Sequence, residues 1–106
     1  MDEKMSEKAF ELILHAGNSR SSSMEALMLA RKGQYEEAQE KFEDADKEFH
    51  LAHEVQTSML FANAQGAETK PDILMVHAQD HFTMAMVCFD LCKEMVNMYQ
   101  EMREHK

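Results

Sequence analysis

Apolar and small residues recur along the chain in alternating steps of four and three, the spacing that lines one face of an α-helix. Ser6 is a candidate N-cap before the first run, and Arg31-Lys32-Gly33 is suited to end it, with two cations in the last turn and a glycine cap. An interior glycine costs about 1 kcal/mol relative to Ala, so we expect Gly17 to permit close approach of a neighbouring helix or ligand. The pattern predicts a first helix whose buried stripe consists of Phe10, Leu14, Gly17, Ser21, Met24 and Met28.

A second helix of about 30 residues is predicted by a similar stripe. Its outer face carries mostly Glu, Asp and Lys, and Ala64-Gln65-Gly66-Ala67-Glu68 interrupts the pattern. Thr69-x-x-Asp72, with Pro71 in the first turn, then indicates the start of a third helix. The second stripe comprises Tyr35, Ala38, Phe42, Ala45, Phe49, Ala52, Gln56 and Met59. Together the three segments predict an all-α, up-down-up three-helix bundle.

The third predicted helix carries two apolar stripes, where a surface helix of a small monomer needs one. One stripe comprises Leu74, Ala78, His81, Ala85, Cys88, Cys92, Met95 and Tyr99. The other comprises Ile73, His77, Asp80, Met84, Val87, Leu91, Glu94 and Met98. A helix that is apolar almost all round is normally central, so we expect several copies of this helix to pack together at an axis.

Composition and charge further limit the class of protein and its possible partners. The 106 residues form one domain by length, residues 1–106, and contain three glycines and one proline, which suits long uninterrupted helices. The formal net charge of −9 disfavours partners such as nucleic acid or an anionic membrane. The sequence has no signal peptide and no membrane-spanning run, so we expect a cytoplasmic protein. Cys88 and Cys92 are interpreted as reduced core thiols and the eleven methionines as a soft core.

A short polar segment, His77-Ala78-Gln79-Asp80-His81, interrupts the apolar stripes of the third helix. It places His77 and His81 one turn apart, with Asp80 on the flank of His77. Three interpretations compete. The residues could be satisfied polar groups at a subunit interface, which leaves a purely structural helical trimer. They could instead form the metal site of a small hydrolase, because H-x-x-D-H is similar to the inverted zinc motif H-x-x-E-H, although no further ligand is identifiable by spacing.

The third interpretation is an imidazole that accepts a phosphoryl group. A neutral histidine offers one nitrogen lone pair for attack while a hydrogen bond to its other nitrogen fixes the tautomer. Phosphoryl transfer between proteins depends mainly on positioning and charge compensation. A carrier of this kind needs no glycine-rich nucleotide loop, and the sequence contains none.

Three motifs resemble those of the lactose/cellobiose (chitobiose) class of IIA components of the sugar phosphotransferase system (PTS). They are Ala16-Gly17-Asn18-Ser19-Arg20-Ser21, Ala52-His53-Glu54-Val55-Gln56-Thr57 and Val76-His77-Ala78-Gln79-Asp80-His81, in this order. The resemblance runs from about Phe10 to the end of the third helix. Ser19 departs from the pattern, because alanine is expected there.

The resemblance implies a homotrimer that carries phosphoryl groups during the uptake of a β-disaccharide. His77 would take the group from the phosphocarrier protein HPr and pass it to a cysteine of the IIB component, which serves the membrane component IIC. Asp80 would hold a divalent metal, Mg²⁺ by family analogy, in a structural role at the threefold axis. His81 is expected to assist the transfer, Gln79 is a further supporting candidate, and a supporting role is also plausible for His53.

Overall fold

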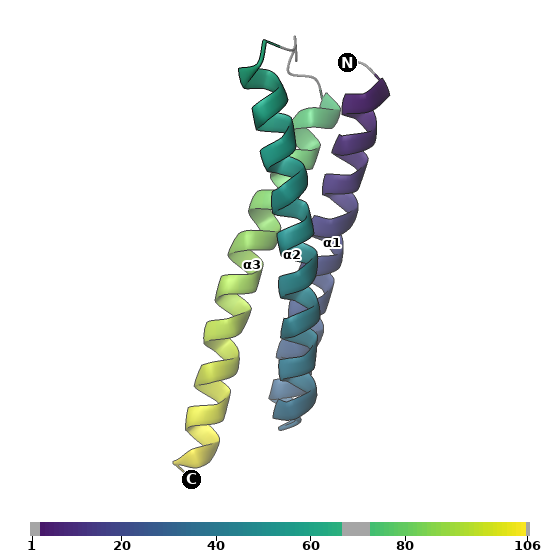
Figure 1. The fold of residues 1–106 in the computed structure, drawn as a ribbon. Helices are drawn as coiled ribbons and strands as arrows, with labels where there is room; N and C mark the ends of the chain where they lie inside the picture. The colour runs from purple at the N-terminus through teal and green to yellow at the C-terminus, as the bar shows by residue number, and fades with distance from the viewer. Residues whose placement is uncertain (1–2, 67–72, 106) are drawn as a thin grey trace.

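The computed structural model describes residues 3–66 and 73–105, and these residues form three long helices. They are α1 (Glu3–Arg31), α2 (Tyr35–Ala64) and α3 (Ile73–Glu104). Each helix runs opposite to the one before it, so the described part of the chain is an up-down-up bundle without strands (Figure 1). The predicted fold class is confirmed.

The connection between α1 and α2 ends the first helix in the predicted way. Gly33 has a φ of +82°, in the left-handed region that favours glycine. The backbone N–H groups of Gly33 and Gln34 donate to the carbonyl oxygens of Ala30 and Leu29, each over 2.9 Å, which satisfies groups left open at the helix end. The predicted start of α1 is wrong, because the helix already begins at Glu3 and includes Ser6. The predicted start of the third helix at Thr69–Asp72 lies outside the described residues.

The stripe predicted on α2 is confirmed, but the stripe predicted on α1 is wrong. The large side chains of the α1 stripe are exposed in the single chain, including Phe10 at 61% and Leu14 at 56%. Small side chains are buried instead, because α1 packs against both α2 and α3 and small residues let the helix axes approach. The buried residues of α1 are Met5, Ala9, Leu12, Ala16, Ser19, Ser23, Ala26 and Ala30.

The expectation that Gly17 permits close approach is also wrong within this chain. A Cβ atom placed at Gly17 would meet no described atom within 4 Å. The packing that it was expected to allow occurs at Ala16 and Ser19, which are fully buried. These two side chains lie on the inner face of α1, so the small residues that matter are neighbours of the glycine.

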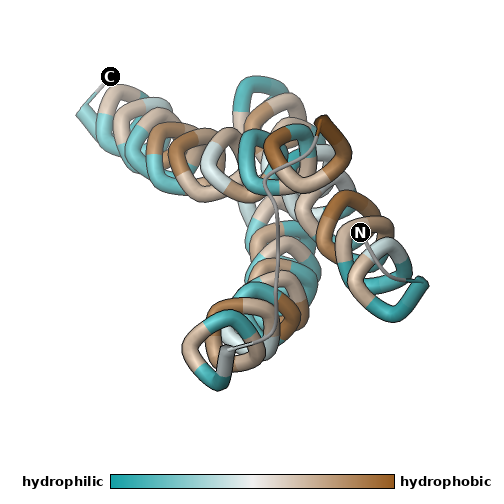
Figure 2. Tube along the Cα trace, turned by 90° about the horizontal axis from the view of Figure 1, so that it is seen from above, coloured by the Kyte–Doolittle hydropathy of each residue, from teal (hydrophilic) through white to brown (hydrophobic). Residues whose placement is uncertain are grey.

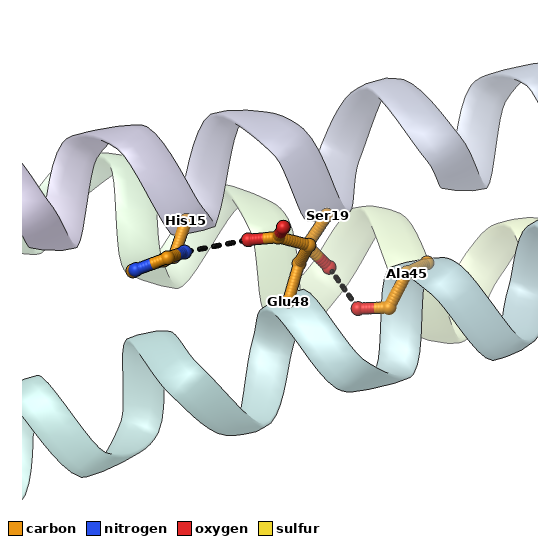
Figure 3. Close-up of polar contacts among 4 residues, drawn as sticks. All are labelled: His15, Ser19, Ala45 and Glu48. Atoms are coloured by element: carbon orange, nitrogen blue, oxygen red, sulfur yellow. Dashed lines mark hydrogen bonds and ion pairs between the residues drawn. The ribbon is translucent and has the colours of Figure 1, made fainter.

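Two apolar clusters form the core. Along α1, the buried polar residues Ser19 and Ser23 fall between the residues of one cluster and those of the other, and we call this level of the bundle the polar layer. In this layer the Ser19 hydroxyl donates to the Ala45 carbonyl oxygen over 2.9 Å, and both residues are buried. Close by, His15 Nδ1 lies 2.6 Å from a carboxylate oxygen of Glu48. Both contacts join α1 to α2, as Figure 3 shows. His15 is therefore half-buried and has a partner on α2.

The bundle is long and thin, with principal extents of 58 × 20 × 16 Å. In both overall views the C-terminal half of α3 diverges from α1 and α2 (Figures 1 and 2). The apolar residues of the second α3 stripe remain exposed in the single chain. They are Ile73, Met84, Val87, Leu91 and Met98.

Candidate functional site

The two predicted histidines lie together near the start of α3. The Nε2 atoms of His77 and His81 are 3.1 Å apart, and the two rings are nearly perpendicular, with an interplanar angle of 87°. At this distance one nitrogen donates a proton and the other accepts it, so the two imidazoles share a hydrogen bond. His77 is exposed and His81 is half-buried. The outer ring, His77, is therefore the one that a partner protein can reach.

The surroundings of His81 favour its neutral form. Partial burial lowers the pKa of His81 below its ordinary value of 6.5, and the nearby His77 and Arg20 lower it further, while the Asp80 carboxylate opposes the shift. A neutral His81 keeps one N–H and one lone pair. It can therefore orient His77, or donate a hydrogen bond to a group carried there.

Residues of α2 lie behind this pair. The Gln56 side-chain amide donates to the side-chain oxygen of Gln79 over 2.9 Å, which ties α2 to the α3 turn between the histidines. The His53 ring lies against Phe82, which is buried, with ring centroids 6.1 Å apart. The Gln79 side chain is thus engaged with α2, and the site rests on a fixed helix pair.

Asp80 is exposed on α3, near the histidines and on the flank with the exposed apolar stripe. Among residues 3–66 and 73–105, no three His, Cys, Asp or Glu side chains of one chain are grouped so that they could hold a metal ion. The interpretation as a zinc hydrolase therefore gains no third protein ligand from this chain. Asp80 can take part in a metal site only if other copies supply further oxygen ligands.

Two side chains near the pair were not assigned a role from the sequence. Arg20 of α1 lies close enough to His81 for its charge to affect the pKa. Gln56 of α2 holds Gln79. Both stand within motifs that carry the family resemblance, so motif membership was the available signal. His50, in contrast, is exposed and lies 3.5 Å from Asp46 on its own helix.

The fold and the site together define a small helical protein with a surface-accessible, hydrogen-bonded histidine pair. The chain matches the family described as PTS system, lactose/cellobiose-specific IIA subunit, over residues 7–100, and it belongs to that family. It is 42% identical over 106 residues to the lichenan-specific phosphotransferase enzyme IIA component of Bacillus subtilis, and the match covers 100% of this chain and 96% of the relative. The family resemblance of the motifs is thereby confirmed.

Solved structures agree with the sequence comparison. The cellobiose-specific enzyme IIA from Bacillus anthracis is similar with a TM-score of 0.95 and 34% identity, covering 100% of this chain and 97% of that one. The IIA(chitobiose) structure solved in complex with HPr is similar with a TM-score of 0.84 and 25% identity, covering 96% and 99%. In the described part of the chain, no helix is both long enough and apolar enough to cross a membrane.

Proposed function

We propose that this IIA component is a phosphoryl carrier and that His77 is its phosphoacceptor. The observation that carries the proposal is the exposed His77 ring, whose Nε2 lies 3.1 Å from Nε2 of His81. An imidazole that is exposed and hydrogen-bonded can meet a donor protein while its tautomer stays fixed. Arg20 supplies a positive charge on the neighbouring helix, which can compensate the charge of a phosphoryl group.

The transfer needs few groups from this chain. The bond from phosphorus to the donor breaks as a bond from phosphorus to a nitrogen of His77 forms, and the reverse exchange delivers the group to the acceptor. His81 acts through its N–H, by orienting His77 or by donating to a phosphoryl oxygen. Gln79 positions this turn of α3 through its bond to Gln56.

The donor is HPr and the acceptor is a cysteine of the cognate IIB component, which serves the membrane component IIC. The similar chitobiose protein, solved in complex with HPr, supports the donor. Val76 is exposed beside His77, at 53%. It belongs to one largely apolar surface on which HPr and IIB bind in turn, because a single imidazole must face each of them. The transported sugar is a β-disaccharide, and the exchange takes place in the cytoplasm.

The working form is a homotrimer in which the exposed stripe of α3 is buried. A single chain leaves that stripe open along the helix, from Ile73 to Met98. Threefold packing of α3 buries these side chains and brings three copies of Asp80 together. The carboxylates are exposed and lie on the flank of the stripe, so they fit a divalent cation with oxygen ligands, such as Mg²⁺, which would neutralise their charge.

Incubation with phosphoenolpyruvate, enzyme I and HPr tests the carrier function directly. We expect intact-mass spectrometry to find one acid-labile phosphoryl group per chain, and none in a His77→Gln protein of unchanged helical content. His81→Ala should still be phosphorylated, but at a rate lower by at least about tenfold, because one hydrogen-bond donor to the developing charge is lost.

His50→Gln is the matched control, because His50 is an exposed histidine of α2 that lies 3.5 Å from Asp46 on its own helix. Its phosphorylation rate should equal that of the parent. Phosphate found on His81 or His53 of a native-like protein would overturn the assignment of His77. A His81→Ala protein that is phosphorylated as fast as the parent would remove His81 from the transfer.

A further inference from the structure

Three sulfur atoms lie close together between α1 and α3, with that of Cys92 in contact with the other two. Cys92 belongs to the core cluster that also contains Ala26, Ala30 and Phe42. The sulfurs of Cys88 and Cys92 are 3.8 Å apart, and the Cys92 thiol donates to the sulfur of Met24 over 3.7 Å. Both cysteines are free. The phosphoryl carrier function uses none of these residues, and the site at His77 lies more than two turns earlier along α3.

The two separations that Cys92 makes, to the sulfurs of Cys88 and of Met24, match those between ligands of one bound metal ion. Metal–thiolate bonds are about 2.3 Å long, so sulfurs in trigonal or tetrahedral positions around one ion lie about 3.8 to 4.0 Å apart. Cysteine and methionine sulfurs are soft donors, which bind Cu(I) and, for the thiolates, also Zn(II); the thioether makes Cu(I) the better fit. No carboxylate or imidazole is needed to complete a site of this kind.

The three sulfur-bearing side chains differ in how far they are exposed to solvent. Cys92 is 3% exposed, Cys88 is half-buried, and Met24 is 46% exposed. An ion can therefore reach Met24 first and then pass to the thiols. Met95 stands about one turn from Cys92 on α3 and is also exposed, which adds a weak sulfur donor along the approach.

We propose that Cys88, Cys92 and Met24 form a binding site for one soft monovalent metal ion, Cu(I). The two thiols become thiolates, their protons leave to the solvent, and the Met24 thioether supplies the third ligand without a change of charge. Burial, and then the neighbouring Cys88, raise the pKa of the Cys92 thiol to about 11. The empty site therefore holds a thiol at Cys92, and the ion has to displace this proton.

Anaerobic titration of the full-length protein with Cu(I), in competition with the chromophoric chelator bicinchoninate, tests the site. We expect the parent to withdraw one Cu(I) per chain from the chelator. Cys88→Ser and Cys92→Ser should abolish this uptake. Met24→Leu, which keeps the apolar bulk, should weaken Cu(I) binding by more than about tenfold. Removing even a residue that only supports a metal ligand can cause a loss of this size.

Met28→Leu is the control, because Met28 is an exposed methionine one turn from Met24 on the same helix. Its Cu(I) affinity should equal that of the parent, and circular dichroism should show unchanged helix content in every variant. Failure of the parent to take up Cu(I) would overturn the site. So would equal affinities of Met24→Leu and the parent, or Zn(II) that competes with Cu(I) on equal terms.

Discussion

The two histidines of α3 differ in burial, and this difference separates the roles proposed for them. His77 is exposed, whereas His81 is half-buried and has a lowered pKa. The spacing of four residues was enough to predict that the rings meet, because residues at i and i+4 share a helix face. It did not predict Arg20, since that side chain comes from another helix and only the packing of α1 against α3 brings its charge close.

The pKa of His81 can be altered in predictable directions. We expect NMR titration of the metal-free protein to give His81 a pKa below 6.5, because burial is the largest cause of the shift. Removing a nearby positive charge should raise this pKa, so His77→Gln and Arg20→Gln should move it toward 6.5 without reaching it. Asp80→Asn should lower it further.

Arg31→Gln, at the far end of α1, is the control and should leave the titration of His81 unchanged. The sign of the effect on stability follows from the same shift. As the pH falls through 6.5, the unfolded chain takes up a proton that the folded His81 resists, so this residue lowers stability in acid and has no effect above 6.5. A pKa of His81 above 6.5 in the native protein would contradict this account.

At the scale of the helices, the sequence predicted α2 well and α1 poorly, for a physical reason. The apolar stripe predicted on α2 coincides with its buried face, and the exposed large apolar residues of this helix, Leu51, Leu60 and Phe61, lie outside that stripe. In α1 a face of large apolar residues competes with a face of alanines and serines, and the bundle buries the smaller face because close helix packing requires small side chains. The face left exposed, with Phe10 and Leu14, adds to the apolar surface that an oligomer could cover.

Ser19 shows what the polar layer contributes. Its side chain is fully buried and donates to the Ala45 carbonyl oxygen, which lies within α2 and keeps its helical partner. We expect Ser19→Ala to destabilise the fold by about 0.5–1.5 kcal/mol, because one hydrogen bond is lost and no buried group is left without a partner. Ser19→Val should cost about 1–3 kcal/mol through overpacking of the closely packed α1–α2 contact.

Urea unfolding followed by circular dichroism measures both changes. Ser21→Ala is the control, because Ser21 is exposed on the same helix, and its midpoint should stay close to that of the parent. A Ser19→Val protein as stable as Ser19→Ala would show that the helices are not closely packed at this layer.

The two glycines of α1 and its turn should respond to alanine in opposite ways. Gly33 has a φ of +82°, which strains any residue that carries a Cβ, so Gly33→Ala should destabilise the chain by about 1–2 kcal/mol. Gly17 lies in open space within the helix, so Gly17→Ala should stabilise the chain by about 0.4–1 kcal/mol. Thermal unfolding compares the two, and sedimentation of Gly17→Ala tests whether a second copy packs there: weakened assembly would place Gly17 at an interface.

At the scale of the whole molecule, the exposed stripe of α3 is the feature that a single chain leaves unexplained. The sequence predicted it because two apolar stripes on one helix exceed what one bundle face can bury. The structure of one chain confirms the exposure of Ile73, Met84, Val87 and Leu91. The arrangement of copies was beyond any argument from periodicity, since a stripe indicates a contact and does not fix the symmetry.

Asp80 decides whether the proposed trimer depends on metal. If three copies of α3 meet at an axis, three carboxylates meet with them, and each pair at about 4 Å repels by about 4 kcal/mol at an effective dielectric near 20. A divalent cation with oxygen ligands would relieve this repulsion. We therefore expect chelation at neutral pH to weaken assembly of the parent. Asp80→Leu should assemble with or without chelator, because it replaces buried like charges by apolar packing.

Sedimentation velocity with and without chelator measures both effects. Asp90→Leu is the matched control, because it removes an exposed carboxylate from the same helix and should leave the metal dependence of the parent intact. A parent trimer that ignores chelation would separate assembly from metal. An Asp80→Leu protein that falls to monomers would place Asp80 away from the axis, because a leucine at a threefold contact strengthens the packing that holds the copies together.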